Sequence, residues 1–398
     1  MVLASNPFIY GKVHMKITRP VALAVASASA IVLAFVPAAQ AASLVVGGAS
    51  SVATVVADCK TDYTAKTGDS FAYASSSSGQ GQKDMETGKD DFAFSDSAHL
   101  TSQSGTPVPA SEIHVPAWVW PIGVMYNLNT TQQVAISYQN VAKIFAGQIT
   151  RWNDPLLQAD NNRTVTKAYY KKDTNGNVVK DAKGAPIVLR TAQVTQKITL
   201  PNQPITVIYR ADSSGTTGNL TAAFNMFDAT TWTKSSKVFT DLVKVANDPI
   251  HFQGANGSAG VAQLAAKTKY SITYAEVNFA ALNKSLSLAS IINPNGDLVQ
   301  PTADAAAGFV ASAPIGDNGV VSLNYLNKGS GVYPFTVVTY ALALTNYGDA
   351  TKAAAVKRAI DYAAFGCTTA APNDGFIQIS PTSPLGVKIK AQLAKLGK

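Results

Sequence analysis

Residues 205–218 join a predicted strand to a predicted helix through residue types that bind anions. The segment reads I-T-V-I-Y-R-A-D-S-S-G-T-T-G, so a β-branched strand ends at Arg210 and a helix opens near Gly215. A helix start offers unpaired backbone N–H groups and the positive end of the helix dipole. Arg210 adds a permanently charged planar donor, and Ser214 and Thr216 add hydroxyl donors. The segment predicts a site for a tetrahedral oxyanion; an ordinary serine-capped loop is the alternative.

Three earlier segments offer donors of the same kinds. Residues 47–51 (G-G-A-S-S) and residues 75–81 (S-S-S-S-G-Q-G) each lie between a predicted strand and a predicted helix, and residues 92–96 read F-A-F-S-D. Glycines let the backbone approach a ligand closely, while helix starts and hydroxyls donate hydrogen bonds. A flexible linker is the alternative for the serine run, but the run is short and closely bracketed. We expect all four segments to meet at the mouth of a sheet.

Asp96 is a carboxylate within this set of donors. An ionised carboxylate can only accept hydrogen bonds, so it favours a ligand that carries a proton, such as hydrogen phosphate, over sulfate. A helix cap or a turn aspartate is the alternative for Asp96. Asp212, two residues after Arg210, is predicted to hold the guanidinium in place; otherwise it is only a turn residue.

Strand and helix patterns alternate along most of the chain, which predicts an α/β protein with mainly parallel sheets and crossover helices. About 357 residues remain after a predicted signal, more than one hydrophobic core usually serves, so two lobes are expected. Predicted strands cover residues 43–46, 69–74, 91–94, 118–126, 205–209, 271–274 and 335–344, and predicted helices cover 51–66, 81–87, 134–145 and about 350–364.

Residues 164–197 interrupt this alternation with many Lys, Asp, Asn and Gly residues. We interpret them as a polar surface hairpin inserted in the second lobe, with a turn at residues 173–177. The alternating Asp and Asn residues do not match a calcium loop, because its glycine and its distal glutamate do not fall at the required positions.

The first forty-odd residues have the composition of a secretory signal. Three cations precede an apolar run over residues 21–36 and a small-residue A-Q-A site at 39–41. We expect residues 1–41 to be removed, which lowers the formal net charge from +8 to +5 because three cations and no carboxylate are lost. The apolar run is short for a membrane span, and no cysteine near the cleavage site would carry a lipid. The product is therefore expected in the periplasm or outside the cell.

The remaining composition excludes several function classes. Mild basicity suits small anions, but no Lys/Arg run or basic-aromatic interleaving indicates a nucleic-acid partner. After the signal the chain has only His99, His114 and His251, with no G-x-S-x-G, H-E-x-x-H or Walker motif, so an enzyme is not expected and each histidine is interpreted as a surface or packing residue.

Cys59 and Cys367 would form one disulfide in an oxidising compartment; two unpaired buried thiols are the alternative.

The order of several motifs resembles the periplasmic phosphate-binding proteins of ABC phosphate importers, the PstS type. The resemblance runs over residues 43–276 and more weakly to the C-terminus, and its most specific part is D-F-x-x-S-D followed by R-x-D-x-S-G-T. The similar segments are L-V-V-G-G-A-S-S, T-G-D-S-F-A-Y, S-S-G-Q-G, D-F-A-F-S-D, I-F-A-G-Q-I-T-R-W-N-D-P, I-T-V-I-Y-R-A-D-S-S-G-T-T and S-I-T-Y-A-E.

The resemblance implies a type II periplasmic-binding-protein fold. Two α/β lobes, each a mainly parallel sheet flanked by helices, would be joined by crossing strands with the ligand cleft at the hinge. Residues 42–122 plus 279–398 would form lobe I, and residues 123–278 would form lobe II. The family holds its ligand by hydrogen bonds, so neither a metal nor another cofactor is expected.

The resemblance also assigns the ligand contacts residue by residue. Two departures from the family pattern matter: Ser51 stands where a phenylalanine is usual, which removes apolar cover, and Phe94 replaces a small residue beside the site. The implied phosphate ligands are Ser50, Ser51, Ser78, Asp96, Arg210, Ser214, Gly215 and Thr216.

The implied function is that of an exported, monomeric solute-binding protein that captures inorganic phosphate and delivers it to the membrane permease of an ABC importer. Binding of another oxyanion, such as sulfate, molybdate or a phosphonate, is one alternative. A phosphate-scavenging surface protein outside a transporter is another.

Overall fold

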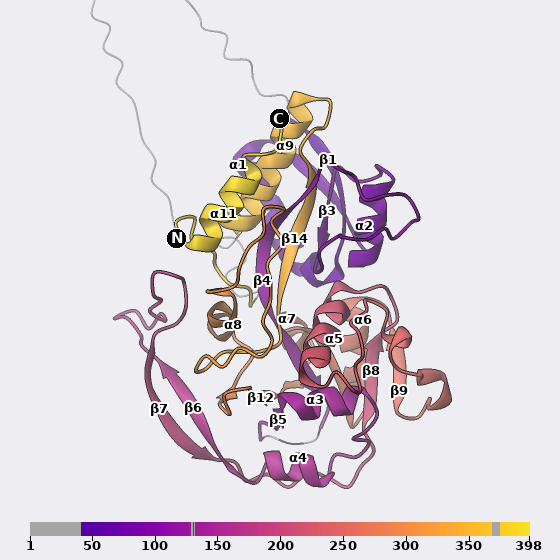
Figure 1. The fold of residues 1–398 in the computed structure, drawn as a ribbon, viewed down its shortest axis with the longest axis vertical. Helices are drawn as coiled ribbons and strands as arrows, with labels where there is room; N and C mark the ends of the chain where they lie inside the picture. Colours follow the sequence, from indigo (N-terminus) through magenta and orange to yellow (C-terminus); the bar gives the residue numbers. More distant parts are fainter. Residues whose placement is uncertain (1–40, 129, 131, 368–374) are drawn as a thin grey trace, which may run out of the picture. The chain divides into compact units, whose positions relative to one another are not determined.

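The structure, a computed structural model, describes residues 41–128, 130, 132–367 and 375–398, and its longest strand is β4 (Glu112–Tyr126) (Figure 1). Among these residues, nine strands form one mixed sheet, with β11 (Ser287–Leu288) paired to β4 beside the main order. The main order is β2 (Ser70–Ser75), β1 (Ser43–Gly48), β3 (Phe92–Ser95), β14 (Thr336–Leu344), β4, β10 (Ser271–Glu276), β8 (Thr206–Arg210) and β9 (Phe252–Ala255).

Strand β4 changes its pairing partner in mid-strand. It pairs antiparallel with β14 as far as Pro121 and antiparallel with β10 from Ile122 onward. We call β2, β1, β3, β14 and residues 112–121 the first half-sheet, and residues 122–126 with β10, β8 and β9 the second half-sheet. Within them, β1 is parallel to β2 and β3, and β8 is parallel to β9 and β10. The predicted α/β class with mainly parallel strands is confirmed.

Helices follow the parallel strands of both half-sheets. In the first, η1 (Ser50–Val52) and α1 (Ala53–Thr67) follow β1, and α2 (Ser78–Glu86) follows β2; α5 (Gly215–Phe227) and α6 (Gly257–Lys267) follow β8 and β9 in the second. Figure 1 shows α1 grouped with α9 (Ala350–Asp361) and α11 (Pro384–Leu393) beside the first half-sheet. The remaining helices are α3 (Tyr138–Phe145), α4 (Pro155–Asp160), α7 (Asn278–Ala281), α8 (Ala303–Val310), the 3-10 turns η2 (Phe239–Asp241) and η3 (Val245–Asn247), and the π-helical turn η4 (Tyr362–Gly366).

The apolar run at residues 118–126 forms a strand buried on both faces, as predicted. Strand β4 is longer than that run and is buried from Ile113 to its end. Its two tryptophans, Trp118 and Trp120, are 2 % and 0 % exposed, and Trp118 packs on Phe94 with ring centroids 4.6 Å apart. Burial of such large side chains anchors the middle of the fold.

The helix predicted over residues 134–145 is only partly correct. Its first part is the strand β5 (Ala135–Ser137), which pairs in parallel with β12 (Ser290–Ile292), and α3 begins after it. Strand β12 also pairs with β13 (Leu298–Val299). The β-branched residues Val134 and Ile136 favour the extended form, and a distant partner strand stabilises it.

The polar insert is a hairpin of β6 (Thr164–Tyr170) and β7 (Val188–Thr195). Its tip, residues 171–187, contains two tight turns rather than the one predicted at 173–177. In each turn an aspartate, Asp173 or Asp181, accepts two backbone N–H groups at 2.9 Å. These local bonds suit the Asp, Asn and Gly residues of the tip.

Strand pairing modifies the predicted division into lobes. The predicted lobe boundary at residues 122 and 123 coincides with the change of partner in β4. However, β11 and β12 pair with the end of β4 and with β5, which belong to the predicted lobe II. In the division that we now propose, the chain returns to lobe I after Val299 instead of after residue 278.

Cys59 of α1 and Cys367 are bonded as a disulfide in the structure, with Cα atoms 5.3 Å apart. Both side chains are buried, and the bond joins positions 308 residues apart, near the two ends of the described chain. Its formation in an oxidising compartment stays a prediction.

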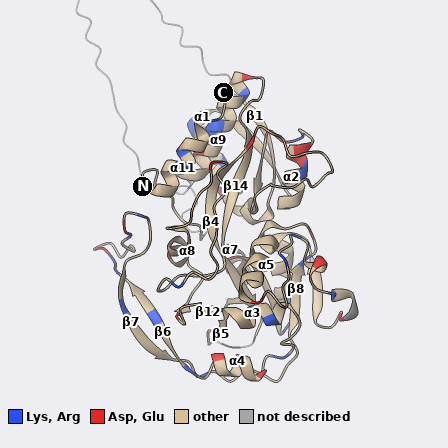
Figure 2. Cartoon of the chain, in the orientation of Figure 1, with Lys and Arg blue, Asp and Glu red and all other residues tan. Residues whose placement is uncertain are grey.

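The predicted signal segment falls on residues 1–40, outside the described residues. Within the part of the chain that the structure describes, no helix is both long enough and apolar enough to cross a membrane. Figure 2 shows the strands of both half-sheets mostly in tan, with the coloured Lys, Arg, Asp and Glu residues mainly on helices and connecting segments.

Candidate functional site

The four segments predicted to bind an anion come together in the structure. Ser50 and Ser51 lie in η1 directly after β1, and Ser78 is the first residue of α2. Asp96 directly follows β3, and Arg210 ends β8. Parallel strands present their carboxyl ends at one edge of a sheet, which is where ligands bind in open α/β folds.

The Asp96 carboxylate accepts three hydroxyl hydrogen bonds. Ser51 Oγ donates to Oδ1 at 2.9 Å and Thr339 Oγ1 donates to the same oxygen at 2.6 Å. Thr216 Oγ1 lies 3.2 Å from Oδ2, so α5 reaches Asp96 from the second half-sheet. Asp96 is 2 % exposed, and burial raises its pKa above the usual value even though these hydroxyls and Arg210 favour the charged form.

Arg210 is buried, and Asp212 holds its guanidinium. The Arg210 Nε donates to Asp212 Oδ1 at 2.7 Å and Nη2 donates to Oδ2, which forms a bidentate pair. Nη1 donates to Ser258 Oγ at 3.1 Å. Burial alone would lower the pKa of Arg210, but Asp212 raises it above the usual value, and Arg210 in turn keeps the pKa of Asp212 low against the effect of burial. Asp212 therefore pairs with the guanidinium, and its role behind a bound ligand stays a prediction.

The start of α5 lies against the start of α2. The Gly79 backbone N–H donates to the Ser213 carbonyl at 2.9 Å. Ser214 is the N-cap of α5, and its hydroxyl accepts the Thr217 N–H at 3.2 Å. A Cβ added to Gly215 would lie 2.5 Å from Ser78 Oγ and 2.8 Å from Asp96 Cβ, so only glycine allows this approach.

The remaining predicted ligands also keep donor capacity. Ser78 Oγ accepts the Asp96 N–H at 3.0 Å, and Ser50 Oγ accepts the Ser258 N–H at the same distance. A hydroxyl that accepts one N–H still has its own proton to donate. All eight residues predicted to bind the ligand therefore lie in one buried region at the junction of the two half-sheets.

Three residues of this region were not assigned a role from the sequence. Ser258 in the first turn of α6 contacts Arg210 and Ser50, and Thr339 of β14 accepts the Trp120 indole N–H at 3.0 Å while it donates to Asp96. Glu276 ends β10, and its Oε1 lies 2.9 Å from Thr216 Oγ1. The strand-to-helix segment N-G-S-A-G at 256–260 has the composition of the other donor loops and was a usable signal for Ser258.

The two residues that depart from the family pattern, Phe94 and Ser51, have different roles in the structure. Phe94 is 2 % exposed and packs against Trp118 and Phe92, so its ring belongs to the core and does not cover the site. Ser51 is fully buried, and its hydroxyl donates to Asp96. The chain thus has a hydrogen-bond donor to Asp96 at the position of the usual phenylalanine.

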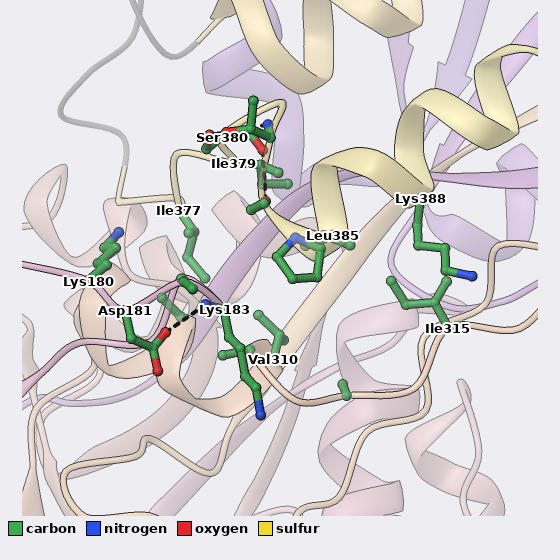
Figure 3. A pocket seen from close by; sticks show the side chains of 18 of the residues that line it. Lys180, Asp181, Lys183, Val310, Ile315, Ile377, Ile379, Ser380, Leu385 and Lys388 are labelled. Carbon is green, nitrogen blue, oxygen red and sulfur yellow. Dashed lines mark hydrogen bonds between the residues drawn. The ribbon is translucent and has the colours of Figure 1, made fainter.

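A separate cavity of about 520 Å³ lies between the tip of the insert, α8 and the segment before α11 (Figure 3). Apolar side chains such as Val310 and Ile377 line it, with Lys183 and Lys388 at its border. It shares no lining residue with the region around Asp96 and Arg210. In the described residues, no group of three or more His, Cys, Asp or Glu side chains is arranged to hold a metal ion.

Comparison with known proteins agrees with this geometry. A family profile described as the PBP superfamily domain matches residues 36–364. The phosphate-binding protein PstS2 of Mycobacterium bovis is 31 % identical over 335 residues, which cover 81 % of this chain and 77 % of that protein. The chain belongs to the PstS-type family of the PBP superfamily. Another PstS-type relative, the phosphate-binding protein PstS of Pasteurella multocida, is 29 % identical over 76 % of each chain.

Solved structures place the same fold on this chain. The phosphate-binding protein of Stenotrophomonas maltophilia superposes with a TM-score of 0.62 at 18 % identity, over 88 % of this chain and 93 % of that one. A phosphate ABC transporter substrate-binding protein of Clostridium perfringens, solved with bound phosphate, gives a TM-score of 0.51 at 16 % identity, over 85 % of this chain and all of that one. The PstS-type chain described here therefore has the type II periplasmic-binding-protein fold.

Proposed function

We propose that this chain is a solute-binding protein that captures inorganic phosphate at the junction of its two half-sheets. The observation that carries the proposal is the Asp96 carboxylate, buried among hydroxyl donors and close to the Arg210 guanidinium. A carboxylate in a donor-rich site favours an anion that still carries a proton. The membership in the PstS-type family and the names of its relatives support the same ligand.

The proposed contacts follow the chemistry of each side chain. Arg210 and the backbone N–H groups at the start of α5 would hold the phosphate charge, and Asp96 would accept the proton of hydrogen phosphate. The hydroxyls of Ser50, Ser78 and Ser214 and the backbone N–H groups of Ser51 and Thr216 would complete the shell. The hydroxyls of Ser51 and Thr216 would stay on Asp96. Charge-assisted hydrogen bonds contribute about 1.5–3 kcal/mol each, and a micromolar complex needs a net binding free energy of about −8 kcal/mol. About six such bonds therefore suffice after desolvation and closure are offset.

Capture would proceed by closure of the two lobes over the ligand. The contacts of Thr216 with Asp96 and of Gly79 with Ser213 join the two half-sheets, and β4 is the strand that both share. Phosphate that bridges Asp96 and Arg210 would stabilise this closed arrangement. We propose that the closed form is what the membrane permease of an ABC importer recognises, and that the protein is exported, monomeric and free of metal or other cofactor.

Transport and catalysis require different groups, and the family is one of binding proteins rather than an enzyme class. Binding of sulfate, molybdate or a phosphonate remains the alternative ligand choice, and phosphate scavenging outside a transporter is the alternative role. Asp96 argues against fully deprotonated anions, because its carboxylate would repel them.

Calorimetric titration of the mature protein tests the proposal. Bound anion is first removed by unfolding and refolding, and phosphate, sulfate and molybdate are then titrated between pH 5 and pH 8. The proposal predicts tight phosphate binding with no sulfate heat. Equal binding of phosphate and sulfate would favour a general oxyanion protein, and no heat from any of the three would reject the proposed function.

A further inference from the structure

The Thr216 hydroxyl lies between two buried carboxyl groups. Its Oγ1 is 3.2 Å from Asp96 Oδ2 and 2.9 Å from Glu276 Oε1. Thr216 and Glu276 are fully buried, and Asp96 is 2 % exposed. The two acids come from opposite half-sheets, since Asp96 follows β3 and Glu276 ends β10. They therefore share this hydroxyl only when the two half-sheets are in contact.

The Thr216 hydroxyl between Asp96 and Glu276 has too few protons for both acids to be ionised. A threonine hydroxyl has one proton, so it can donate to one of the two carboxyl oxygens but not to both. The other carboxyl oxygen then faces a hydroxyl oxygen at hydrogen-bond distance, and that contact is attractive only if the carboxyl group itself carries a proton. The geometry thus requires one additional proton on the pair.

The surroundings place this proton on Glu276. Asp96 has the hydroxyls of Ser51 and Thr339 as further donors, which stabilise its ionised form. By contrast, Glu276 Oε2 is buried and has no hydrogen-bond partner among the described residues. An ionised carboxylate with an unpaired buried oxygen costs far more free energy than a neutral one. Glu276 therefore donates to Thr216, and Thr216 donates to Asp96.

The other charged and titratable groups around Glu276 do not supply a free cation. Arg210, at the end of β8, forms its bidentate pair with Asp212. Tyr274, on the same strand as Glu276, has its hydroxyl at Thr217 and at the Arg210 N–H, and its pKa is raised to about 12 by burial. The elements α5 and α6 face Glu276 with the neutral side chains of Thr216 and Ser258. Burial and Asp96 raise the pKa of Glu276 by more than its own backbone N–H, the Ser258 hydroxyl and the Arg210 charge lower it.

A bound phosphate increases the excess of negative charge in the site. The Arg210 charge is already balanced by Asp212, and Asp96 adds a negative charge. If Glu276 were also ionised, the ligand would join two unbalanced carboxylates in a buried site, where like charges repel strongly. A proton on Glu276 removes one of these charges and supplies a donor.

Building on the proposed function, we propose that Glu276 takes up a proton as the protein closes on phosphate, so that phosphate capture is coupled to proton uptake. Phosphate binding by this chain is then favoured in acidic surroundings, and Glu276 is a residue that sets this preference without being one of the ligand contacts assigned above.

The pH range of the coupling follows from the two states of Glu276. Burial and the nearby Asp96 raise the pKa of Glu276 to about 7 in the structure. Separation of the half-sheets would remove Asp96 and admit water, which would move this pKa toward the ordinary value of 4.5. The favourable contribution to closure is complete below the ordinary value and is lost as the pH rises to the raised value. Between about pH 5 and pH 7 the coupling of one proton weakens phosphate binding by up to about tenfold per pH unit.

Calorimetry in buffers of different ionisation enthalpy measures this proton directly. Phosphate is titrated at pH 6 into the wild type, Glu276→Gln and the control Asp304→Asn. Asp304 belongs to α8, outside the candidate site, and its carboxylate lies 3.4 Å from the Lys180 Nζ. The wild type and Asp304→Asn should each take up about one proton per phosphate more than Glu276→Gln. Because all three titrations contain the same ligand, protons gained or lost by phosphate itself cancel in the comparison.

The outcomes separate this inference from the proposed function. Phosphate binding with equal proton uptake in the wild type and in Glu276→Gln would overturn the inference alone. A refolded wild type that gives no phosphate heat would overturn the proposed function and the inference with it.

A second measurement does not depend on the folding of the variant. Infrared difference spectra of the wild type at pH 6, with and without phosphate, should gain the C=O stretch of a protonated carboxylic acid, and this band should shift in D2O. A phosphate-induced spectrum without such a band would overturn the inference even if Glu276→Gln did not fold.

Discussion

Gly215 at the start of α5 lies against Ser78 at the start of α2, so closely that a Cβ on Gly215 would be 2.5 Å from the Ser78 Oγ. The contact joins the two half-sheets at the candidate site. The absence of a side chain at position 215 is therefore a condition for closure, and a single substitution removes it.

Gly215→Ala is expected to weaken phosphate binding at least 100-fold while the fold is retained. The added methyl group would meet Ser78 and Asp96, and it would hold the two half-sheets apart. Alanine is favoured over glycine inside a helix, so the free energy of unfolding should not fall by more than about 1 kcal/mol. Titration calorimetry measures the affinity, and urea unfolding measures the stability.

Gly260→Ala in α6 is the matched control for this variant. The nearest atom to a Cβ at Gly260 would be 3.7 Å away, an ordinary contact distance. An equal loss of phosphate affinity in both glycine variants would show that closure does not depend on the Gly215 contact.

Asp96→Asn should reduce discrimination between phosphate and sulfate. The amide can donate a hydrogen bond to a fully deprotonated anion, which the carboxylate repels. Since a hydrogen bond to a charged group contributes about 1.5–3 kcal/mol, the ratio of sulfate to phosphate affinity should rise by roughly 10- to 100-fold. Titration of both anions at pH 8 measures this ratio.

The exposed Asp173 in the insert offers the control Asp173→Asn, which should leave the ratio unchanged. An Asp96→Asn protein that binds phosphate and still excludes sulfate would remove Asp96 from the proposed site.

Arg210→Ala is expected to abolish tight phosphate binding. The substitution removes the buried cation and leaves Asp212 without its bidentate partner. Truncation of one member of such a pair costs about 2–5 kcal/mol, which corresponds to a loss of roughly 30- to 5,000-fold. Arg190→Ala is the control, because Arg190 lies over the Tyr169 ring in the insert, 4.1 Å from its centroid. Wild-type affinity in Arg210→Ala would reject the assigned site.

Glu86 should stabilise the fold at neutral pH and lose this effect in acid. His99 Nε2 lies 2.9 Å from its Oε1, and the Gln103 and Ser104 backbone N–H groups donate to its carboxylate. Burial raises the pKa of Glu86, but the Ser104 hydroxyl and these bonds lower it to about 2. The contribution of Glu86 to the free energy of unfolding is complete above its ordinary pKa of 4.5 and is lost as the pH falls toward 2.

Glu86→Gln is therefore expected to lower the free energy of unfolding by about 1–3 kcal/mol at pH 7, with a smaller difference at pH 3. Urea unfolding of the wild type and the variant at both pH values measures it, with Asp181→Asn in the insert as the control. A difference that grows toward pH 3 would contradict this sign.

The Cys59–Cys367 disulfide predicts that the unfolded, non-reduced protein has no reactive thiol. Replacement of both cysteines by serine should lower the free energy of unfolding by about 2–5 kcal/mol, because the bond closes a very long loop of the unfolded chain. Thiol titration in denaturant measures the first quantity and urea unfolding the second. Two reactive thiols in the untreated protein would favour the unpaired alternative.

The sequence was sufficient to predict the α/β class and to indicate the donor loops. Each loop follows a short strand, and the use of residue types such as Gly215 and Ser78 depends on local backbone geometry. The split of residues 134–145 into β5 and α3 could not be predicted, since β12 supplies the strand partner from more than 150 positions away.

The same dependence on distant strands explains why part of the candidate site could not be predicted. Thr339 and Glu276 reach Asp96 and Thr216 through strands β14 and β10, and the pairing of those strands is decided by the whole sheet. A threonine or a terminal glutamate in a strand has no local signal that distinguishes it from an ordinary buried residue. Only the register of the sheet brings these side chains to the ligand loops.

The position of β14 between β3 and β4 constrains the order in which the molecule can be completed. β3 and β4 lie early in the chain, whereas β14 begins at Thr336. During synthesis or export, one edge of β3 and one edge of β4 stay unpaired until β14 emerges. Pairings between strands that lie this far apart in the sequence form slowly. The protein is thus expected to reach its native state only after nearly the whole chain is free, so a fragment that ends before residue 336 should not fold into an independent binding unit.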